Sequence, residues 1–177
     1  MGIGNTSSAA AILCALTNMP PADVVGRGTG IDDATLARKI AAIERGLEVN
    51  RPDAADPLDV LAKLGGLEIG AIIGVILGAA AARIPMVLDG FISGAAAILA
   101  QRFSPYVRDI LFASHLSAEK GHRLLLDELE LEPALDLQMR LGEGTGACLL
   151  MGLIEASVKI MAEMATFQSA GVGAKNQ

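Results

Sequence analysis

Three short apolar runs in the second half of this chain each lead through a polar loop into a helical pattern. The runs lie at residues 84–88, 107–113 and 134–139. Helical patterns follow at residues 92–102, 118–130 and 146–166. A succession of strand, loop and helix is typical of βα units, whose strands pair in parallel. The sequence therefore predicts an α/β fold, rich in helix, with a Rossmann-like parallel sheet.

The first half of the chain is predicted to be helical. Helices are expected at residues 6–16, 20–25, 33–48, 57–64 and 67–82. Asp32 and Asp56 precede two of these helices and are expected N-caps, with Pro57 at the first position of the second.

The last of these helices has an uncharged stretch at residues 69–82. It falls short of the roughly 20 apolar residues that a membrane span needs. Gly70, Gly74 and Gly78 share one helix face, a spacing known from membrane helices that also lets helices pack tightly in a soluble core. We expect a buried core helix and no membrane association.

Charge and aromatic content exclude some classes of partner. The net charge is -6, and aromatic residues make up 3% of the 177 residues, with no tryptophan. Such a chain lacks the basic surface and the stacking side chains of nucleic-acid-binding proteins, and anionic membranes do not attract it. The sequence does not open with a basic and apolar leader, so we expect no signal peptide and a cytoplasmic location.

The cysteines and histidines do not predict a metal site. Cys14 and Cys148 are isolated in apolar helical stretches and are expected to be buried, reduced thiols. His115 and His122 are seven positions apart, which matches no common ligand spacing. We expect His115 to be a hydrogen-bonded loop residue and His122 a surface residue at a helix start, with neither a metal ion nor another cofactor.

The three loops that follow the predicted strands hold the polar residues of an otherwise apolar region. They lie at residues 89–91, 114–117 and 142–145. Ligands of parallel sheets bind beyond the carboxyl ends of the strands, so these loops predict a small-molecule site. In the third loop Glu143 stands between two glycines. It is either a catalytic base or a helix N-terminal carboxylate favoured by the helix dipole.

A second glycine-rich loop opens the chain and runs into the first predicted helix. Its residues are Gly2, Ile3, Gly4, Asn5 and Thr6. Their backbone N–H groups and the Asn5 and Thr6 side chains could cradle a phosphate at the helix N-terminus. The same residues could equally form an ordinary helix cap.

Six motifs follow one another along the sequence: Met-Gly-Ile-Gly-Asn-Thr at residues 1–6, Val-Val-Gly-Arg-Gly-Thr-Gly at 24–30, Leu-Asp-Gly-Phe-Ile at 88–92, Ala-Ser-His-Leu-Ser at 113–117, Leu-Gly-Glu-Gly-Thr-Gly-Ala at 141–147 and Met-Ala-Thr-Phe at 164–167. By their order and spacing they resemble the nicotinate-nucleotide–dimethylbenzimidazole phosphoribosyltransferase family. The resemblance covers nearly the whole chain but only the C-terminal half of family members.

The resemblance implies how the chain is organised. Residues 1–170 would be the C-terminal half of a phosphoribosyltransferase domain, with the last helix able to join a small helical subdomain and residues 171–177 forming a flexible tail. The chain would be a piece of a longer protein or one half of a split enzyme. Family members are homodimers. Without the strands of the other half, we expect an exposed apolar edge that promotes self-association.

The resemblance also implies a reaction. The family transfers phosphoribosyl from nicotinate mononucleotide to 5,6-dimethylbenzimidazole in cobalamin lower-ligand assembly. The products are α-ribazole 5′-phosphate and nicotinate, and no cofactor takes part. A single inverting displacement would use Glu143 as general base. The alternative is an inactive fragment that only binds a nucleotide phosphate or a partner chain.

Further site residues follow from the same resemblance. Lys39 would contact the phosphate, or else be a solvated lysine beside Arg38. Second-line contacts to ribose and nicotinate are expected from Arg27, Gly28, Thr29, Asp89, Ser117, Leu141 and Gly142. Arg27 is either an anion contact or a surface charge.

Overall fold

The computed structural model describes residues 2–28 and 30–172 of the chain. Thr29, the predicted tail beyond residue 172 and Met1 of the first motif lie outside the described residues. The first half is helical, as predicted: α1 is Thr6–Thr17, α2 Pro21–Val24, α3 Asp33–Asn50, α4 Pro57–Leu64 and α5 Leu67–Ala82.

The predicted helix caps are confirmed at both positions. The Asp32 side chain accepts a hydrogen bond from the Thr35 backbone N–H at 2.7 Å. The Asp56 carboxylate accepts from the N–H groups of Leu58 and Asp59, and Pro57 occupies the first helical position. These bonds satisfy donors that have no partner inside the helix, which fixes where α3 and α4 begin.

The second half alternates strands and helices. Its elements are β1 Met86–Leu88, α6 Phe91–Phe103, the 3-10 helix η1 Pro105–Ile110, β2 Leu111–Ala113, β3 His115–Ser117, α7 His122–Glu128, β4 Leu135–Met139 and α8 Thr145–Glu163. The α/β class is confirmed, and the largest differences from the prediction lie between residues 105 and 122.

The differences have local causes. The strand predicted at residues 107–113 is only half right, because Pro105 has the fixed φ of a helical turn and opens η1. The loop predicted at residues 114–117 contains strand β3 instead. The helix predicted from residue 118 begins only at His122, because the Ser117 hydroxyl accepts the Glu119 N–H and holds a turn there.

The strands pair in parallel, in two small sheets joined at Ser114 and the neighbouring Ala113. β1 pairs with β2 and β3 pairs with β4. Ser114 lies between β2 and β3, and its N–H donates to the Leu88 carbonyl of β1 at 3.1 Å while its carbonyl accepts from Leu135 of β4 at 3.0 Å. The predicted parallel arrangement is therefore present, as short and staggered pairs rather than one continuous sheet.

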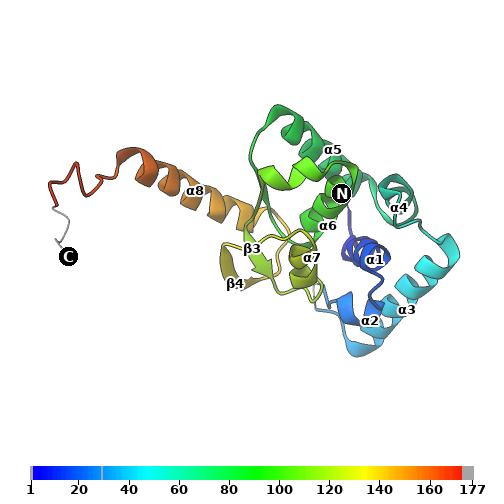
Figure 1. Ribbon diagram of the computed structural model, residues 1–177. Helices are drawn as coiled ribbons and strands as arrows, with labels where there is room; N and C mark the ends of the chain where they lie inside the picture. Colours follow the sequence, from blue (N-terminus) through cyan, green and yellow to red (C-terminus); the bar gives the residue numbers. More distant parts are fainter. Residues whose placement is uncertain (1, 29, 173–177) are drawn as a thin grey trace, which may run out of the picture.

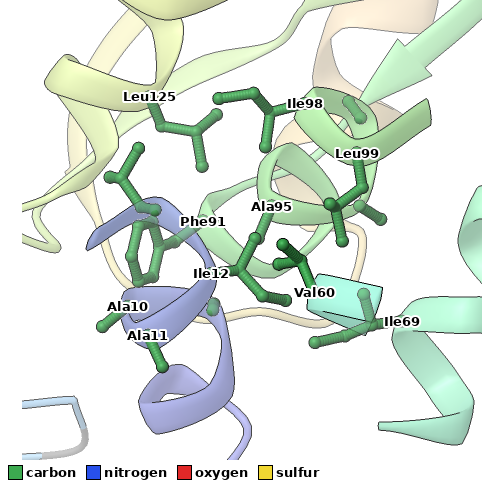
Figure 2. Packing of buried hydrophobic residues seen from close by; sticks show 14 of the residues in the cluster. Ala10, Ala11, Ile12, Val60, Ile69, Phe91, Ala95, Ile98, Leu99 and Leu125 are labelled. Carbon is green, nitrogen blue, oxygen red and sulfur yellow. The ribbon is translucent and has the colours of Figure 1, made fainter. Parts of the chain in front are cut away.

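The core is built mainly from helices. α1 and α6 run through its centre and supply alanines that let the neighbouring helices approach closely. Figure 2 shows Ile12 of α1 and Ala95 of α6 packed among Val60, Ile69 and Leu125 from three other helices.

The packing of α5 differs in part from expectation. The helix buries Ile69, Ile73 and Ile76, but its glycine stripe is not a tight interface, since a methyl group added at Gly74 or Gly78 would meet nothing within 4 Å. The stripe faces outward because the isoleucines occupy the opposite face.

The two cysteines differ from each other. Cys14 is buried as predicted, and burial raises the pKa of its thiol to about 11. Cys148 is exposed, so the prediction of a buried thiol is wrong at that position. The helix that carries it is covered only at its first turns.

That helix, α8, extends away from the rest of the molecule (Figure 1). Gly146, Ala147 and Leu150 are its buried residues, and most of the remaining length is exposed. Among the described helices α8 has the length and hydropathy of a membrane span, properties that core helices of soluble proteins share. Its charged residues recur every fourth position at Glu155, Lys159 and Glu163, so they share one face and leave apolar side chains on the others.

Candidate active site

Glu143 lies in the loop that joins β4 to α8. Its side chain is exposed. The next residue, Gly144, has a φ of +78°, a left-handed conformation that favours glycine and turns the chain into α8 at Thr145. The glycine that follows Glu143 is therefore needed to place the carboxylate directly before a helix N-terminus.

Asp89 holds this loop from the end of β1. One carboxylate oxygen accepts the Gly144 N–H at 3.1 Å, and the other accepts the Ala147 N–H at 3.2 Å. Two of the three loops expected at the carboxyl ends of the strands thus meet. The structure directs the Asp89 carboxylate to backbone groups of the Glu143 loop.

Residues 114 and 115, from the remaining predicted loop, pack against the same two loops. The Ser114 hydroxyl donates to the Asp89 carbonyl at 2.8 Å and lies 3.0 Å from Nδ1 of His115. His115 is only 1% exposed and belongs to β3, not to a loop as expected. A methyl group at Gly146 would lie 2.6 Å from Cε1 of His115 and closer still to Nδ1, so only glycine fits there.

His122 belongs to the same buried group. It is 2% exposed, so its predicted surface position is wrong. Its Nδ1 accepts the Ser117 N–H at 2.8 Å, which draws the ring inward. Burial lowers the pKa of His122 to about 4, with repulsion from His115 adding to the effect and attraction to Asp89 opposing it. At neutral pH this imidazole is uncharged and acts as an acceptor.

A second cluster forms where α1, α3 and residues 25–28 meet. Nζ of Lys39 donates to Oγ1 of Thr6 at 2.9 Å and to the Gly26 carbonyl at 3.3 Å. Burial lowers the pKa of Lys39, and attraction to Glu119 opposes that shift. Lys39 is therefore not a solvated neighbour of Arg38 but a half-buried cation at the N-terminus of α1.

The glycine loop of residues 2–6 lies at the same place. Gly4 has a φ of +80° and turns the chain into α1. Asn5 stands at the N-cap position, but its side chain makes no capping hydrogen bond. Ile3 is exposed. The interpretation as an ordinary side-chain cap therefore finds no support at Asn5, and its amide remains available to a ligand.

Two carboxylates that the sequence analysis did not select flank this cluster. Glu68 lies against the backbone of Gly2, where a methyl group would also approach Nδ2 of Asn5 at 2.6 Å. Oε2 of Glu119 is buried with no hydrogen-bond partner among the described residues, and it lies against Gly26. Glu119 does not stand in a glycine-rich motif, and the glycines near Glu68 read as the end of one helix and the start of the next. The only hint was that Glu119 comes two positions after Ser117.

The remaining predicted contacts are less enclosed. Arg27 forms an exposed ion pair with Asp33 and donates to the Ile31 carbonyl at 2.8 Å, an arrangement that suits a surface charge. Gly28 has a φ of +54° and faces Oγ1 of Thr6. Leu141 and Gly142 are exposed. Across residues 2–28 and 30–172, no group of three or more His, Cys, Asp or Glu side chains could hold a metal ion.

One stretch of chain, residues 114–121, contacts both clusters, and we call it the bridging segment. At one end, Ser114 donates to the Asp89 carbonyl and His115 lies against Gly146. At the other end, Glu119 lies against Gly26 and interacts with the charge of Lys39. A cation at a helix N-terminus and an exposed carboxylate on an anchored loop are thus joined by one continuous element. The arrangement suits a ligand with an anionic end and a centre that loses a proton.

Comparisons with known proteins show the family of this chain. A family model described as phosphoribosyltransferase matches residues 1–172. A protein of Desulforudis audaxviator named nicotinate-nucleotide–dimethylbenzimidazole phosphoribosyltransferase is 64% identical over 177 residues, 99% of this chain and 50% of the relative. One of the same name from Geotalea uraniireducens is 60% identical over 97% of this chain and 49% of the relative.

A solved structure gives the same result in three dimensions. The crystal structure of CobT from Thermus thermophilus matches with a TM-score of 0.92 and 51% identity, covering 98% of this chain and 51% of that one. The chain therefore spans about half the length of the relatives that it matches.

Proposed function

This chain belongs to the nicotinate-nucleotide–dimethylbenzimidazole phosphoribosyltransferase family, and from that premise we propose that it takes part in phosphoribosyl transfer from nicotinate mononucleotide to 5,6-dimethylbenzimidazole. The relatives are twice as long. The proposal therefore concerns the steps that the residues of this chain can perform, with residues 1–170 as the C-terminal half of the catalytic unit.

Glu143 is the general base in this proposal. One ring nitrogen of the benzimidazole attacks C1′ of the ribose, and the bond from C1′ to the pyridinium nitrogen breaks, leaving its electron pair on nicotinate. The proton on the other ring nitrogen passes to the Glu143 carboxylate. Attack from the face opposite the leaving group inverts C1′ and gives the α-nucleotide. The exposed carboxylate on a loop fixed by two hydrogen bonds supports this role.

The 5′-phosphate is placed at the second cluster. Lys39 supplies a positive charge beside Thr6, and the N-terminus of α1 adds backbone donors and a favourable dipole. The side-chain amide of Asn5, which makes no capping hydrogen bond, is a further donor. Ser117 and Gly28 are kept in the proposal as second-line contacts to the ribose and nicotinate, and so is Asp89, whose carboxylate also bonds to the Glu143 loop.

The observation that carries the proposal is the joining of the two clusters by the bridging segment. The bridging segment contacts both the surroundings of Lys39 and the residues that hold the Glu143 loop. This arrangement suits a substrate whose phosphate and reacting carbon belong to one nucleotide. We extend the proposal to a cytoplasmic homodimer, because the thiols are unpaired and α8 leaves apolar side chains exposed.

The test is a turnover assay with both substrates. The chain would be incubated with nicotinate mononucleotide and dimethylbenzimidazole, alone and with the N-terminal half of the Thermus thermophilus relative, and α-ribazole 5′-phosphate detected by mass spectrometry. We expect product in the complemented mixture. Product formation by the added half alone, or none in any mixture while nucleotide still binds, would favour the binding-only alternative.

A further inference from the structure

The peptide bond that follows Glu143 is held by a side chain from a distant part of the sequence. The N–H of that peptide belongs to Gly144 and donates to Asp89, 55 residues earlier in the chain, at 3.1 Å. The second Asp89 oxygen accepts the Ala147 N–H one turn further on, at 3.2 Å. The two bonds therefore fix both the last peptide of the loop and the first turn of α8.

No side chain next to the N-terminus of α8 makes these bonds. The N-cap position of α8 is Gly144, which has no side chain, and no side-chain cap bond is made there. Backbone N–H groups in the first turn of a helix need an outside acceptor. Asp89 supplies it as a carboxylate, and charged acceptors at a helix N-terminus bind more strongly than neutral ones.

Asp89 is itself fixed in place. It follows the buried Leu88 of β1, and its own carbonyl accepts the Ser114 hydroxyl at 2.8 Å. Ser114 is fully buried and also joins the two small sheets through its backbone. The carboxylate thus projects from a strand end with little freedom to move, which is what an anchor for a catalytic loop requires.

We propose that Asp89 is a positioning residue that sets the orientation of Glu143 through the Gly144 and Ala147 amides. The proposal rests on the function proposed for Glu143. It gives Asp89 a role that its expected contact with ribose or nicotinate does not include, since each of its oxygens accepts a bond from the loop. Its effect should appear in the rate of the chemical step and not in substrate affinity.

Two variants and one control test the anchor directly. Asp89→Ala removes both acceptors, and Asp89→Asn keeps one acceptor and replaces the other by a donor. Ser93→Ala is the control, since Ser93 bonds only to Gly90 in the same segment and does not contact the Glu143 loop. Amide hydrogen exchange at Gly144 and Ala147 and backbone order at Glu143 are measured by NMR on the full chain.

We expect exchange at Gly144 and Ala147 to be about tenfold faster in Asp89→Ala, with a smaller change in Asp89→Asn and none in Ser93→Ala. Backbone order at Glu143 should fall in parallel, while amides in α1 and α3 keep their exchange rates. Unchanged exchange at Gly144 and Ala147 would overturn the anchor, whether or not the chain is an enzyme.

Turnover in the complemented assay tests the link to catalysis. We expect Asp89→Ala to lower kcat about tenfold or more, with KM for both substrates within about twofold. In a Glu143→Gln background the Asp89 change should add little, because Asp89 acts through Glu143. A rise in KM alone would identify Asp89 as a substrate contact, and a normal kcat with faster exchange would reduce it to a helix cap. If the unsubstituted chain gives no turnover, the proposed function fails, and the exchange and order measurements still decide the anchor.

Discussion

Gly146 lies so close to the buried imidazole of His115 that no larger side chain fits at this position. The fit is specific to the first turn of α8. Further along the same helix, a methyl group at Gly152 would meet nothing within 4 Å. Within one helix, glycine is therefore required by contact at one position and is merely tolerated at the other. The roles of Gly146, Glu143 and His122 can each be tested by a single substitution.

Gly146→Ala should destabilise the protein by about 1–3 kcal/mol, since the added methyl must displace His115 from a packed site. Gly152→Ala, its matched control, should stabilise by up to about 1 kcal/mol through helix propensity. Chemical denaturation of both variants measures the difference. Equal effects at the two positions would contradict the tight contact with His115.

Glu143→Gln should lower kcat by roughly a hundredfold in the complemented assay, because the amide keeps the shape of the side chain but cannot accept the proton. Affinity for nicotinate mononucleotide should stay within about twofold of the original. Glu155→Gln, at an exposed position on α8, is the control and should turn over normally. Near-normal kcat in Glu143→Gln would remove this residue from the mechanism.

His122 should make the protein less stable in mild acid. Its pKa is about 4 in the folded state, against an ordinary value of 6.5. Between these pH values the unfolded chain binds a proton at His122 and the folded chain does not. The free energy of unfolding therefore falls as pH falls from about 6.5 towards 4. The loss amounts to about 3 kcal/mol at most. Unfolding free energies measured across this range should fall more steeply for the original chain than for His122→Asn, and parallel curves would disprove the effect.

At the scale of elements, the parts defined by neighbouring residues were predictable and the parts defined by distant contacts were not. Helices α1 to α5 follow from apolar periodicity and from caps such as Asp32, whose partner is three residues away. The start of α7 and the burial of His122 depend on how the turn after Ser117 folds inward. The bond from Asp89 to Gly144 crosses 55 residues and leaves no local pattern.

The candidate site divides in the same way. The glycine loops and Glu143 stand out in the sequence because glycines around a carboxylate are unusual in a packed chain. The approach of Lys39 to Thr6 joins residues 33 positions apart, and only the family resemblance pointed to it. Glu68 and Glu119 were missed because each lies against a glycine that is far away in sequence.

Lys39 connects α3 to the start of α1, so its removal should act on the anionic end of the substrate. Lys39→Ala should weaken the binding of nicotinate mononucleotide by about tenfold or more and leave dimethylbenzimidazole binding nearly unchanged. The reason is that the positive charge of the lysine attracts the phosphate, which only the nucleotide carries. Arg38→Ala on the same helix is the control, because Arg38 is exposed and bonds only within α3. Calorimetry with each ligand measures both affinities. Equal weakening of the two ligands would indicate a packing role for Lys39.

At the scale of the molecule, the apolar surface of α8 stands out from the body with little to cover it (Figure 1). Met161 is 86% exposed, and Val158 and Ile160 are exposed beside it. Covering about 400 Å² of such surface contributes about 10 kcal/mol at ~25 cal/mol per Å², comparable with the stability of a whole domain. A surface of this size favours association.

The chain alone should therefore self-associate at micromolar concentration and melt with low cooperativity. Val158→Lys with Met161→Lys should shift sedimentation towards the monomer, because charges on this face oppose its burial. Ser157→Lys, on the same helix, is the control. If the unsubstituted chain sediments as a monomer and unfolds in one sharp thermal transition, α8 needs no neighbour.

The bridging segment has one more consequence. Ser114 and His115 fix one end of it against Asp89 and Gly146, and Glu119 fixes the other end against Gly26, so the folded segment sets the distance between the two clusters. Under the proposed function, a nucleotide that is one phosphate longer, or a nucleoside with no phosphate, should therefore contact one cluster but not both. Inserting a single residue into the turn after Ser117 should change this distance, so that each cluster keeps its own contacts but the two no longer fit the same nucleotide.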